Sequence, residues 1–167
     1  MPRHLAVFPG TFDPITKGHL DIIKRAVALF DNVIVAAAKD PAKNTLFDAD
    51  ERVDMIKAEV KGYKNVMVES FDGLLIDYVK KKKAQVVVRG LRVVSDFEYE
   101  FQMALTNKKL SPKIETVFMM TEDKYAPVSS RFIKDIARLG GKVSDFVTPN
   151  VAKKLKKRFK EVNKKSG

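Results

Sequence analysis

The chain has 167 residues and a mass of 18.8 kDa, a length that suits one compact core and excludes a long repeat array. Its 45% hydrophobic and 32% charged residues exclude intrinsic disorder, and the absence of cysteine excludes disulfides, thiolate nucleophiles and cysteine-bound metals. The net charge of +11 favours anionic partners, but residues 151–167 hold eight basic side chains and one acid, so the first 150 residues are only mildly basic.

The N-terminal residues carry no obvious targeting signal. Residues 1–8 lack the pattern of a secretory signal peptide, because only a few apolar residues precede Pro9. The longest apolar run, residues 33–38, is far shorter than a membrane-spanning helix. We therefore expect a cytoplasmic protein without a membrane partner.

Short apolar runs alternate with longer segments of helical periodicity along the whole chain. We predict five strands, at residues 5–8, 33–38, 66–69, 85–88 and 116–120. We predict six helices, at residues 18–30, 50–60, 73–82, 96–109, 129–139 and 149–162. Because the strands are apolar nearly throughout, both faces of a parallel sheet should be covered by helices. The predicted fold is α/β: a Rossmann-like, doubly wound, five-stranded parallel sheet in one domain, residues 1–167, ending in a basic helix at about 149–163.

Capping patterns support several of these helix boundaries. Residues 48–51 and 95–98 have the spacing of capping boxes, and Thr148 precedes a first-turn proline, Pro149. The pair Gly140–Gly141 should end the fifth helix.

The loop after the first strand, residues 9–19, is rich in glycine, proline and threonine. Gly10 and Gly18 allow a ligand to approach the backbone closely, and the start of the next helix offers amide groups and a positive dipole end to a phosphate. His19 lies in the first helical turn, where it is either a donor to a phosphate oxygen or a solvated histidine. The loop matches neither a GxGxxG nor a P-loop pattern.

Basic side chains follow two other strands. Arg89 and Arg92 come after the fourth strand and could clamp phosphate groups, or form surface ion pairs with Asp96 or Glu98. Lys43 follows the second strand, where it either adds a cation to the same sheet edge or is simply solvated.

Three polar residues near helix starts each have two interpretations. Ser129 and Ser130 open the fifth helix, as plain caps or as a second helix terminus that binds phosphate. Glu100 is either a ligand for a ribose or amine group or an exposed helical acid.

Three separated motifs together resemble one family. Residues 10–14 with 16–19 resemble the nucleotidyltransferases that carry an HxGH-type signature, with Thr16 at the position of the first histidine. This variant resembles the phosphopantetheine adenylyltransferase branch, as do two later stretches: Arg89–Arg92 followed by residues 96–100, and Val128–Ser130 followed by Lys134. The similarity runs from about Leu5 to the last helix, with departures from the commonest residues at Ala126, Pro127 and Arg131.

The resemblance implies transfer of AMP from ATP to 4'-phosphopantetheine, giving dephospho-coenzyme A and pyrophosphate in coenzyme A biosynthesis. It also implies Mg2+ bound mainly through the ATP phosphates, a homohexamer, and coenzyme A as a candidate feedback inhibitor. By resemblance, the catalytic residues would be His19 as transition-state stabiliser, Lys43 and Arg92. The residues that bind the pantetheine substrate would be Thr11, Lys43, Leu75 and Arg89. The ATP-binding residues would be Thr11, Phe12, His19, Gly90, Leu91, Arg92, Glu100, Tyr125, Ala126, Pro127, Val128, Ser129, Ser130 and Arg131.

Two alternative functions remain at this stage. One is a nucleotidyltransferase of the same fold with another phosphorylated acceptor, such as nicotinamide mononucleotide or glycerol phosphate. The other is a nucleic-acid-binding module that uses the basic tail, with binding that weakens steeply as salt rises. Against the second, the tail carries a helical apolar stripe that favours packing on the domain or on a neighbouring subunit: Val151, Leu155, Phe159 and Val162.

Overall fold

The computed structural model describes residues 4–125 and 128–165. Every predicted strand and helix is present, with ends shifted by at most three residues. The strands are β1 (Leu5–Gly10), β2 (Asn32–Lys39), β3 (Val66–Asp72), β4 (Val86–Leu91) and β5 (Glu115–Met120). The helices are α1 (Lys17–Leu29), α2 (Ala49–Val60), α3 (Leu75–Lys81), α4 (Val94–Leu110), α5 (Ser130–Arg138) and α6 (Pro149–Lys165).

The five strands form one parallel sheet in the order β3-β2-β1-β4-β5. β1 pairs with β2 over its whole length, from Leu5 opposite Asn32 to Gly10 opposite Ala37. It pairs with β4 only at Ala6 and Val7. The chain reverses its direction of winding between β1 and β4, and ligands of open α/β sheets bind at such a switch point, beyond the carboxyl ends of the strands.

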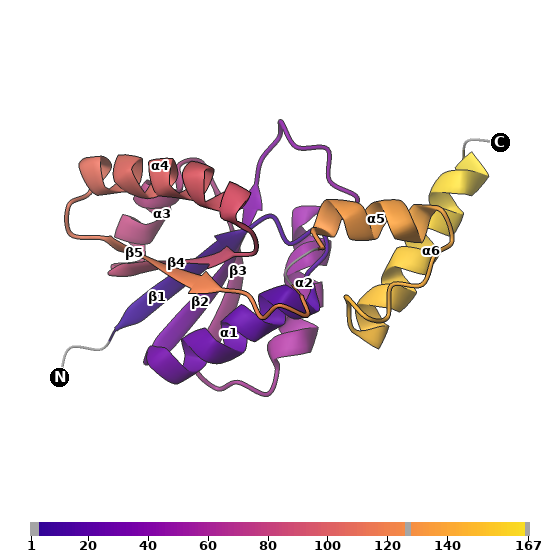
Figure 1. Ribbon diagram of the computed structural model, residues 1–167, viewed down its shortest axis with the longest axis horizontal. Coiled ribbons are helices and arrows are strands. Elements are labelled where there is room, and N and C mark those ends of the chain that lie inside the picture. The colour runs from indigo at the N-terminus through magenta and orange to yellow at the C-terminus, as the bar shows by residue number, and fades with distance from the viewer. Residues whose placement is uncertain (1–3, 126–127, 166–167) are drawn as a thin grey trace.

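Alternate residues of each strand face two apolar layers. On β1, Ala6 and Phe8 join a cluster with buried residues of α1, α2, α5 and α6, whereas Val7 joins a second cluster with α3. Figure 1 shows α4 and α1 on opposite faces of the sheet, with α5 and α6 beyond the carboxyl ends of the strands. The predicted fold class, with helices on both faces, is confirmed.

The C-terminal helix packs on the rest of the chain as its pattern predicts. Val151 and Leu155 are fully buried in the larger cluster, and Phe159 packs against it, while Val162 is 42% exposed. In the residues described, no helix combines the length and the apolar character that crossing a membrane requires.

The predicted helix starts are correct at Asp48, which caps α2 in a capping box with Glu51, and at Thr148, whose hydroxyl accepts from the Val151 amide at 3.4 Å. The capping box predicted at residues 95–98 is wrong. α4 begins two residues earlier than expected, after Val93, which makes no side-chain cap. Asp96 is therefore inside the first turn, and its carboxylate instead accepts from the Arg92 backbone amide at 3.3 Å.

Candidate active site

A cavity of about 600 Å³ opens at the carboxyl ends of β1 and β4. Five segments line it: the β1–α1 loop with the start of α1, residues 43–45 after β2, the end of β4 with the start of α4, the segment after β5, and the start of α5. Residues that are distant in the sequence, such as Thr11 and Arg131, therefore face one space.

The structure brings most of the predicted site residues together in this cavity. Those that line it are Thr11, Phe12, His19, Lys43, Arg89, Gly90, Arg92, Glu100, Tyr125, Val128, Ser129, Ser130 and Arg131. Leu91 does not line it, and Leu75 packs instead against the cluster on the α3 face of the sheet. Ala126 and Pro127 lie outside the described residues. The roles of these four residues stay predictions.

The cavity is electropositive. Its lining includes five basic side chains, Lys43, Arg89, Arg92, Arg131 and Lys134, against three acidic ones, Asp13, Asp96 and Glu100. The first turns of α1 and α5 also face it, and each directs the positive end of a helix dipole toward the same space. This combination of charges and helix ends suits a ligand that carries several phosphate groups.

His19 is held in one orientation by the first turn of α1. The Thr16 backbone amide donates to His19 Nδ1 at 3.1 Å, and the Thr16 hydroxyl accepts from the His19 amide at 3.2 Å, so the two residues form a reciprocal capping box. Because Nδ1 is an acceptor, the neutral ring carries its proton on Nε2, which makes Nε2 a hydrogen-bond donor.

The surroundings of His19 favour this neutral form. The ring packs edge-on against Phe12, with centroids 4.9 Å apart, and lies 6.3 Å from Phe8. Burial, followed by the nearby positive charges of Arg92 and Arg89, lowers the pKa of His19 from 6.5 to about 4. The side chain is therefore a neutral donor throughout the physiological pH range.

This lowered pKa predicts a measurable pH dependence of stability. Between pH 6.5 and 4 the unfolded chain binds a proton at His19 that the folded chain does not, so the free energy of unfolding falls as the pH falls through this window. From pH 7.5 to 5.0 we expect the melting temperature of the wild type to fall about 2–6 °C further than that of His19→Gln. Scanning fluorimetry of both proteins in matched buffers tests this; equal decreases in the two would contradict it.

Gly10 and Phe12 shape the floor of the loop. A Cβ on Gly10 would lie 3.0 Å from two carbons of the Phe12 ring, so this close packing requires glycine. Phe12 has a φ of 51° and is 2% exposed. Its ring therefore belongs to the core, where it packs edge-on against the rings of Phe8 and His19.

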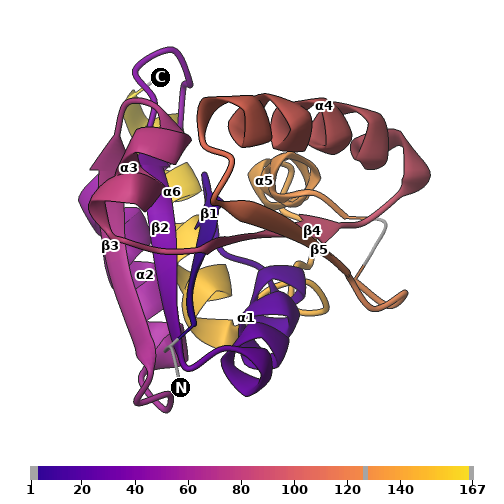
Figure 2. The ribbon, with the colours of Figure 1, turned by 90° about the vertical axis from the view of Figure 1, so that its left-hand side faces the viewer.

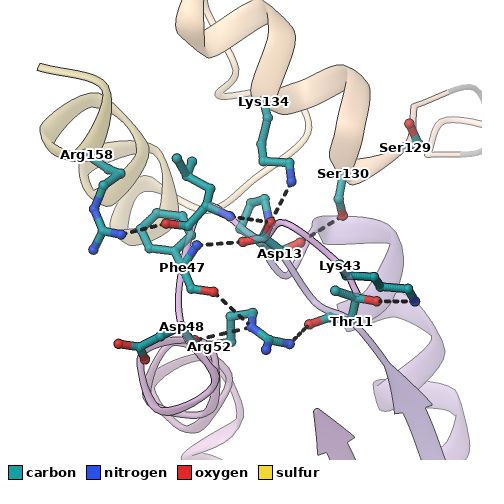
Figure 3. A network of polar contacts seen from close by, with 12 residues as sticks. Thr11, Asp13, Lys43, Phe47, Asp48, Arg52, Ser129, Ser130, Lys134 and Arg158 are labelled. Atoms are coloured by element: carbon teal, nitrogen blue, oxygen red, sulfur yellow. Dashed lines mark hydrogen bonds and ion pairs between the residues drawn. The ribbon is translucent and has the colours of Figure 1, made fainter. Parts of the chain in front are cut away.

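Asp13 links three parts of the site (Figure 3). Its buried carboxylate accepts from the backbone amides of Leu46 at 2.9 Å and Phe47 at 3.0 Å, and pairs with Lys134 Nζ at 2.5 Å. The peptide bond between Asp13 and Pro14 is cis. The carboxylate thus joins the β1–α1 loop to the segment before α2 and to α5.

The same segment before α2 carries Lys43 and brings it to the β1–α1 loop. Lys43 Nζ donates to Thr11 Oγ1 at 3.2 Å, so two of the residues predicted to bind the pantetheine substrate are in contact.

Two of the cavity arginines, Arg89 and Arg92, form specific ion pairs. Arg89 binds both carboxylate oxygens of Glu100, at 2.7 and 2.6 Å, and also donates to the Pro9 carbonyl at 2.9 Å, which ties β4 and α4 to β1. Arg92 pairs with Asp96 at 3.2 Å. The ion-pair interpretation is therefore confirmed for Arg92 with Asp96, but Arg89 pairs with Glu100. Both pairs line the cavity, where a phosphate would compete with the carboxylates.

Both serines of the third motif use their hydroxyl groups within the protein. Ser129 caps α5 by accepting from the Phe132 amide at 3.2 Å, and Ser130 donates to the Pro14 carbonyl at 2.9 Å. The capping interpretation is confirmed for Ser129 but not for Ser130, whose hydroxyl binds the β1–α1 loop instead, and the helix start still lines the cavity.

Sequence reasoning assigned no role to Asp13 or Lys134, although it named both within motifs. Asp13 and Lys134 are 121 positions apart, so no local pattern reports their pairing. The reciprocal capping by Thr16 and His19 could have been found in the sequence, because the two residues have the three-residue spacing of a capping box and precede an apolar stripe.

The fold and the cavity define a protein that binds phosphorylated ligands at the switch point of a parallel sheet, a class that includes the nucleotidyltransferases. The sequence profile of the Cytidylyltransferase-like family matches residues 7–136. The chain is 53% identical over 157 residues to a phosphopantetheine adenylyltransferase of Caldanaerobacter subterraneus subsp. tengcongensis, covering 94% of this chain and 98% of that one. It is 52% identical over 157 residues to the phosphopantetheine adenylyltransferase of Carboxydothermus hydrogenoformans, covering 94% and 97%. The chain belongs to the phosphopantetheine adenylyltransferases of the cytidylyltransferase-like family.

Solved structures of more distant enzymes share the fold. A protein from Vibrio parahaemolyticus, assigned as a nicotinate-nucleotide adenylyltransferase, superposes with a TM-score of 0.70 at 20% identity, covering 92% of this chain and 99% of that one. A bifunctional NMN adenylyltransferase/ADP ribose pyrophosphatase from Francisella tularensis gives a TM-score of 0.68 at 17% identity, covering 93% and 49%. At these identities the likeness concerns the fold alone.

Proposed function

We propose that this enzyme transfers the adenylyl group of ATP to 4'-phosphopantetheine, giving dephospho-coenzyme A and pyrophosphate in coenzyme A biosynthesis. The observation that carries this proposal is the identity of about 53% with named phosphopantetheine adenylyltransferases over nearly the whole chain. The electropositive cavity of about 600 Å³ supports it, since the reaction must hold two phosphorylated substrates side by side.

The reaction needs alignment more than acid–base catalysis. The terminal phosphate of 4'-phosphopantetheine is largely dianionic at pH 7, because the second pKa of a phosphate monoester is about 6. One of its oxygens attacks the α-phosphorus of ATP, a new P–O bond forms, and the bond to the β-phosphate oxygen breaks, with its electron pair leaving on pyrophosphate. No residue has to remove a proton from the nucleophile.

Two groups of side chains fit the two anions. Lys43 and Thr11, which are in contact, would receive the acceptor phosphate, with Arg89 beside them. Arg92 and the starts of α1 and α5 would bind the ATP phosphates. His19 would donate from Nε2 to a non-bridging α-phosphate oxygen, where negative charge increases in the transition state.

Mg2+ is part of the proposal as an ion that enters with ATP. Each cavity carboxylate faces a basic side chain: Asp13 faces Lys134, Asp96 faces Arg92 and Glu100 faces Arg89. This arrangement fits an ion held mainly by phosphate oxygens, as Mg2+ commonly is. When bound, the ion would neutralise charge on the phosphates.

The proposal also covers the enzyme's setting. We place it in the cytoplasm, as one domain over residues 1–167 in which α6 shares the core cluster with α1 and α2. Coenzyme A, which differs from the product by one phosphate, would occupy the same cavity as a competitive inhibitor.

The test is pyrophosphate release from ATP and Mg2+ with 4'-phosphopantetheine, with nicotinamide mononucleotide, or with no acceptor. We expect release only with 4'-phosphopantetheine, and loss of release when Mg2+ is chelated. Release only with nicotinamide mononucleotide would move the enzyme to a neighbouring branch of the same fold. No release with either acceptor would contradict the proposed reaction.

We also propose that the enzyme is a homohexamer, and α4 offers a candidate interface for it. Phe97, Phe101 and Leu105 follow each other at four-residue spacing and are 44%, 46% and 54% exposed, and Val94, one turn earlier, is 91% exposed. Figure 2 shows α4 along the outside of the molecule. An apolar stripe of this kind marks an interaction surface.

We expect the wild type to have a hexameric mass in light scattering coupled to size exclusion, and Leu105→Lys to shift the protein to smaller species. Leu29→Lys is the matched control, because Leu29 is a 66% exposed leucine at the end of α1, away from α4. A hexamer that survives in Leu105→Lys but not in Leu29→Lys would place the interface elsewhere.

A further inference from the structure

Arg52, in the second turn of α2, is a buried cation next to the site described above. The residue is 3% exposed. In residues 4–125 and 128–165, no carboxylate oxygen lies within 4.0 Å of its guanidinium nitrogens, whereas five other arginines each pair with an acid: Arg25, Arg89, Arg92, Arg138 and Arg158. Burying a charge without a counterion is costly, so its backbone partners should matter.

Those partners are four carbonyl groups from three segments. Nη1 donates to the carbonyl of Thr11 at 2.6 Å and of Ala38 at 3.0 Å, and Nε donates to the carbonyls of Phe47 at 3.1 Å and Asp48 at 3.2 Å. The guanidinium therefore ties the β1–α1 loop to the end of β2 and to the start of α2. Figure 3 shows its contacts to Thr11, Phe47 and Asp48.

These segments surround the pair that would receive the acceptor phosphate. Thr11 belongs to the first segment, and Lys43 lies between the second and the third, so Arg52 fixes the backbone on both sides of the contact between Lys43 Nζ and Thr11 Oγ1. None of these four hydrogen bonds of Arg52 reaches the residues of β4 or α5 that are predicted to bind ATP.

We infer that Arg52 is a positioning residue for the acceptor-phosphate subsite. It sets the spacing of Thr11 and Lys43 by holding the backbone of their segments, without touching substrate. The inference rests on the proposed function and adds to it. Only a planar group with several donors can hold carbonyls on two sides at once, so lysine at this position keeps the charge but loses the geometry.

The test is steady-state kinetics of Arg52→Lys with each substrate varied. A displacement of about 1 Å in a reacting group costs up to about 100-fold in rate, so we expect kcat/KM for 4'-phosphopantetheine to fall about 10- to 100-fold, mainly through KM. Thr11 belongs to the predicted ATP-binding residues as well, so the KM for ATP should also rise, but by less than the KM for 4'-phosphopantetheine, because Arg92 and the start of α5 lie outside the segments that Arg52 holds. Calorimetric titration of 4'-phosphopantetheine should show the same loss of affinity.

Arg158→Lys is the matched control. Arg158 holds the same segment from the other side: it donates to the Leu46 carbonyl at 2.6 Å, lies 4.8 Å from the centre of the Phe47 ring and pairs with Glu51, but it contacts neither Thr11 nor Ala38. We expect this variant to lower the melting temperature and to leave both KM values unchanged.

A folded Arg52→Lys protein with unchanged KM for 4'-phosphopantetheine would overturn the inference, and so would equal losses for the two substrates. If Arg52→Lys does not fold, Arg52→Gln, which keeps two N–H donors, is measured by the same criteria. A wild type that is inactive with 4'-phosphopantetheine would instead overturn the proposed function on which the inference rests.

Discussion

Replacement of His19 by alanine is expected to lower kcat by about 100- to 1000-fold, the cost of removing one aligned donor from a developing oxyanion. The KM for each substrate should change less than about threefold, because the Nε2 donor strengthens its hydrogen bond only as charge builds on the α-phosphate. The structure supports this role through the Thr16 amide, which binds Nδ1 and so leaves the proton on Nε2. Initial-rate measurements of pyrophosphate release give both constants.

The chain provides its own control for this experiment, because its only other histidine, His4, lies exposed before β1. His4→Ala should leave kcat and KM unchanged. Should His19→Ala raise KM by as much as it reduces kcat/KM, with kcat unchanged, His19 would contribute only to ground-state binding and the transition-state role would be wrong.

The order and type of the strands and helices could be predicted because the sequence patterns that indicate them are local. A buried parallel strand needs a short apolar run and a covering helix needs a stripe, and both are visible in stretches such as residues 33–38 and 149–162. The residues at which strands and helices end were less predictable. β4 continues through Arg89 and Gly90 because their backbones pair with Phe118 and Met119, a partnership that no local pattern announces.

Site residues could be predicted only where they follow a strand directly in the sequence. The loop 9–19 and the pair Arg89 and Arg92 follow strands directly, so the sheet's geometry places them at one edge. The partners of those side chains depend on contacts across the fold: Glu100 reaches Arg89 from the second turn of α4, and the carbonyls that hold Arg52 come from three segments. Leu75 also comes shortly after the end of a strand, β3. It nevertheless packs in the apolar cluster under α3 and not in the cavity, because α3 covers that face of the sheet.

Asp13→Asn is expected to cost about 3 kcal/mol of folding free energy, within the range for breaking a buried ion pair. The substitution leaves the Lys134 ammonium, whose side chain is 23% exposed, without its counterion. It also reduces the acceptors available to the Leu46 and Phe47 amides. For a chain of this length the melting temperature should fall by about 6–12 °C. Scanning fluorimetry or calorimetry measures it.

Two further variants separate the causes. Asp54→Asn, on the exposed side of α2, is the matched control and should shift the melting temperature by about 1 °C or less. Adding Lys134→Met to Asp13→Asn removes the unpaired ammonium, so the double variant should melt above Asp13→Asn alone, as happens when both members of a buried pair are replaced together. A double variant that melts at or below the single one would show that the lost amide hydrogen bonds, and not the uncompensated charge of Lys134, account for the destabilisation.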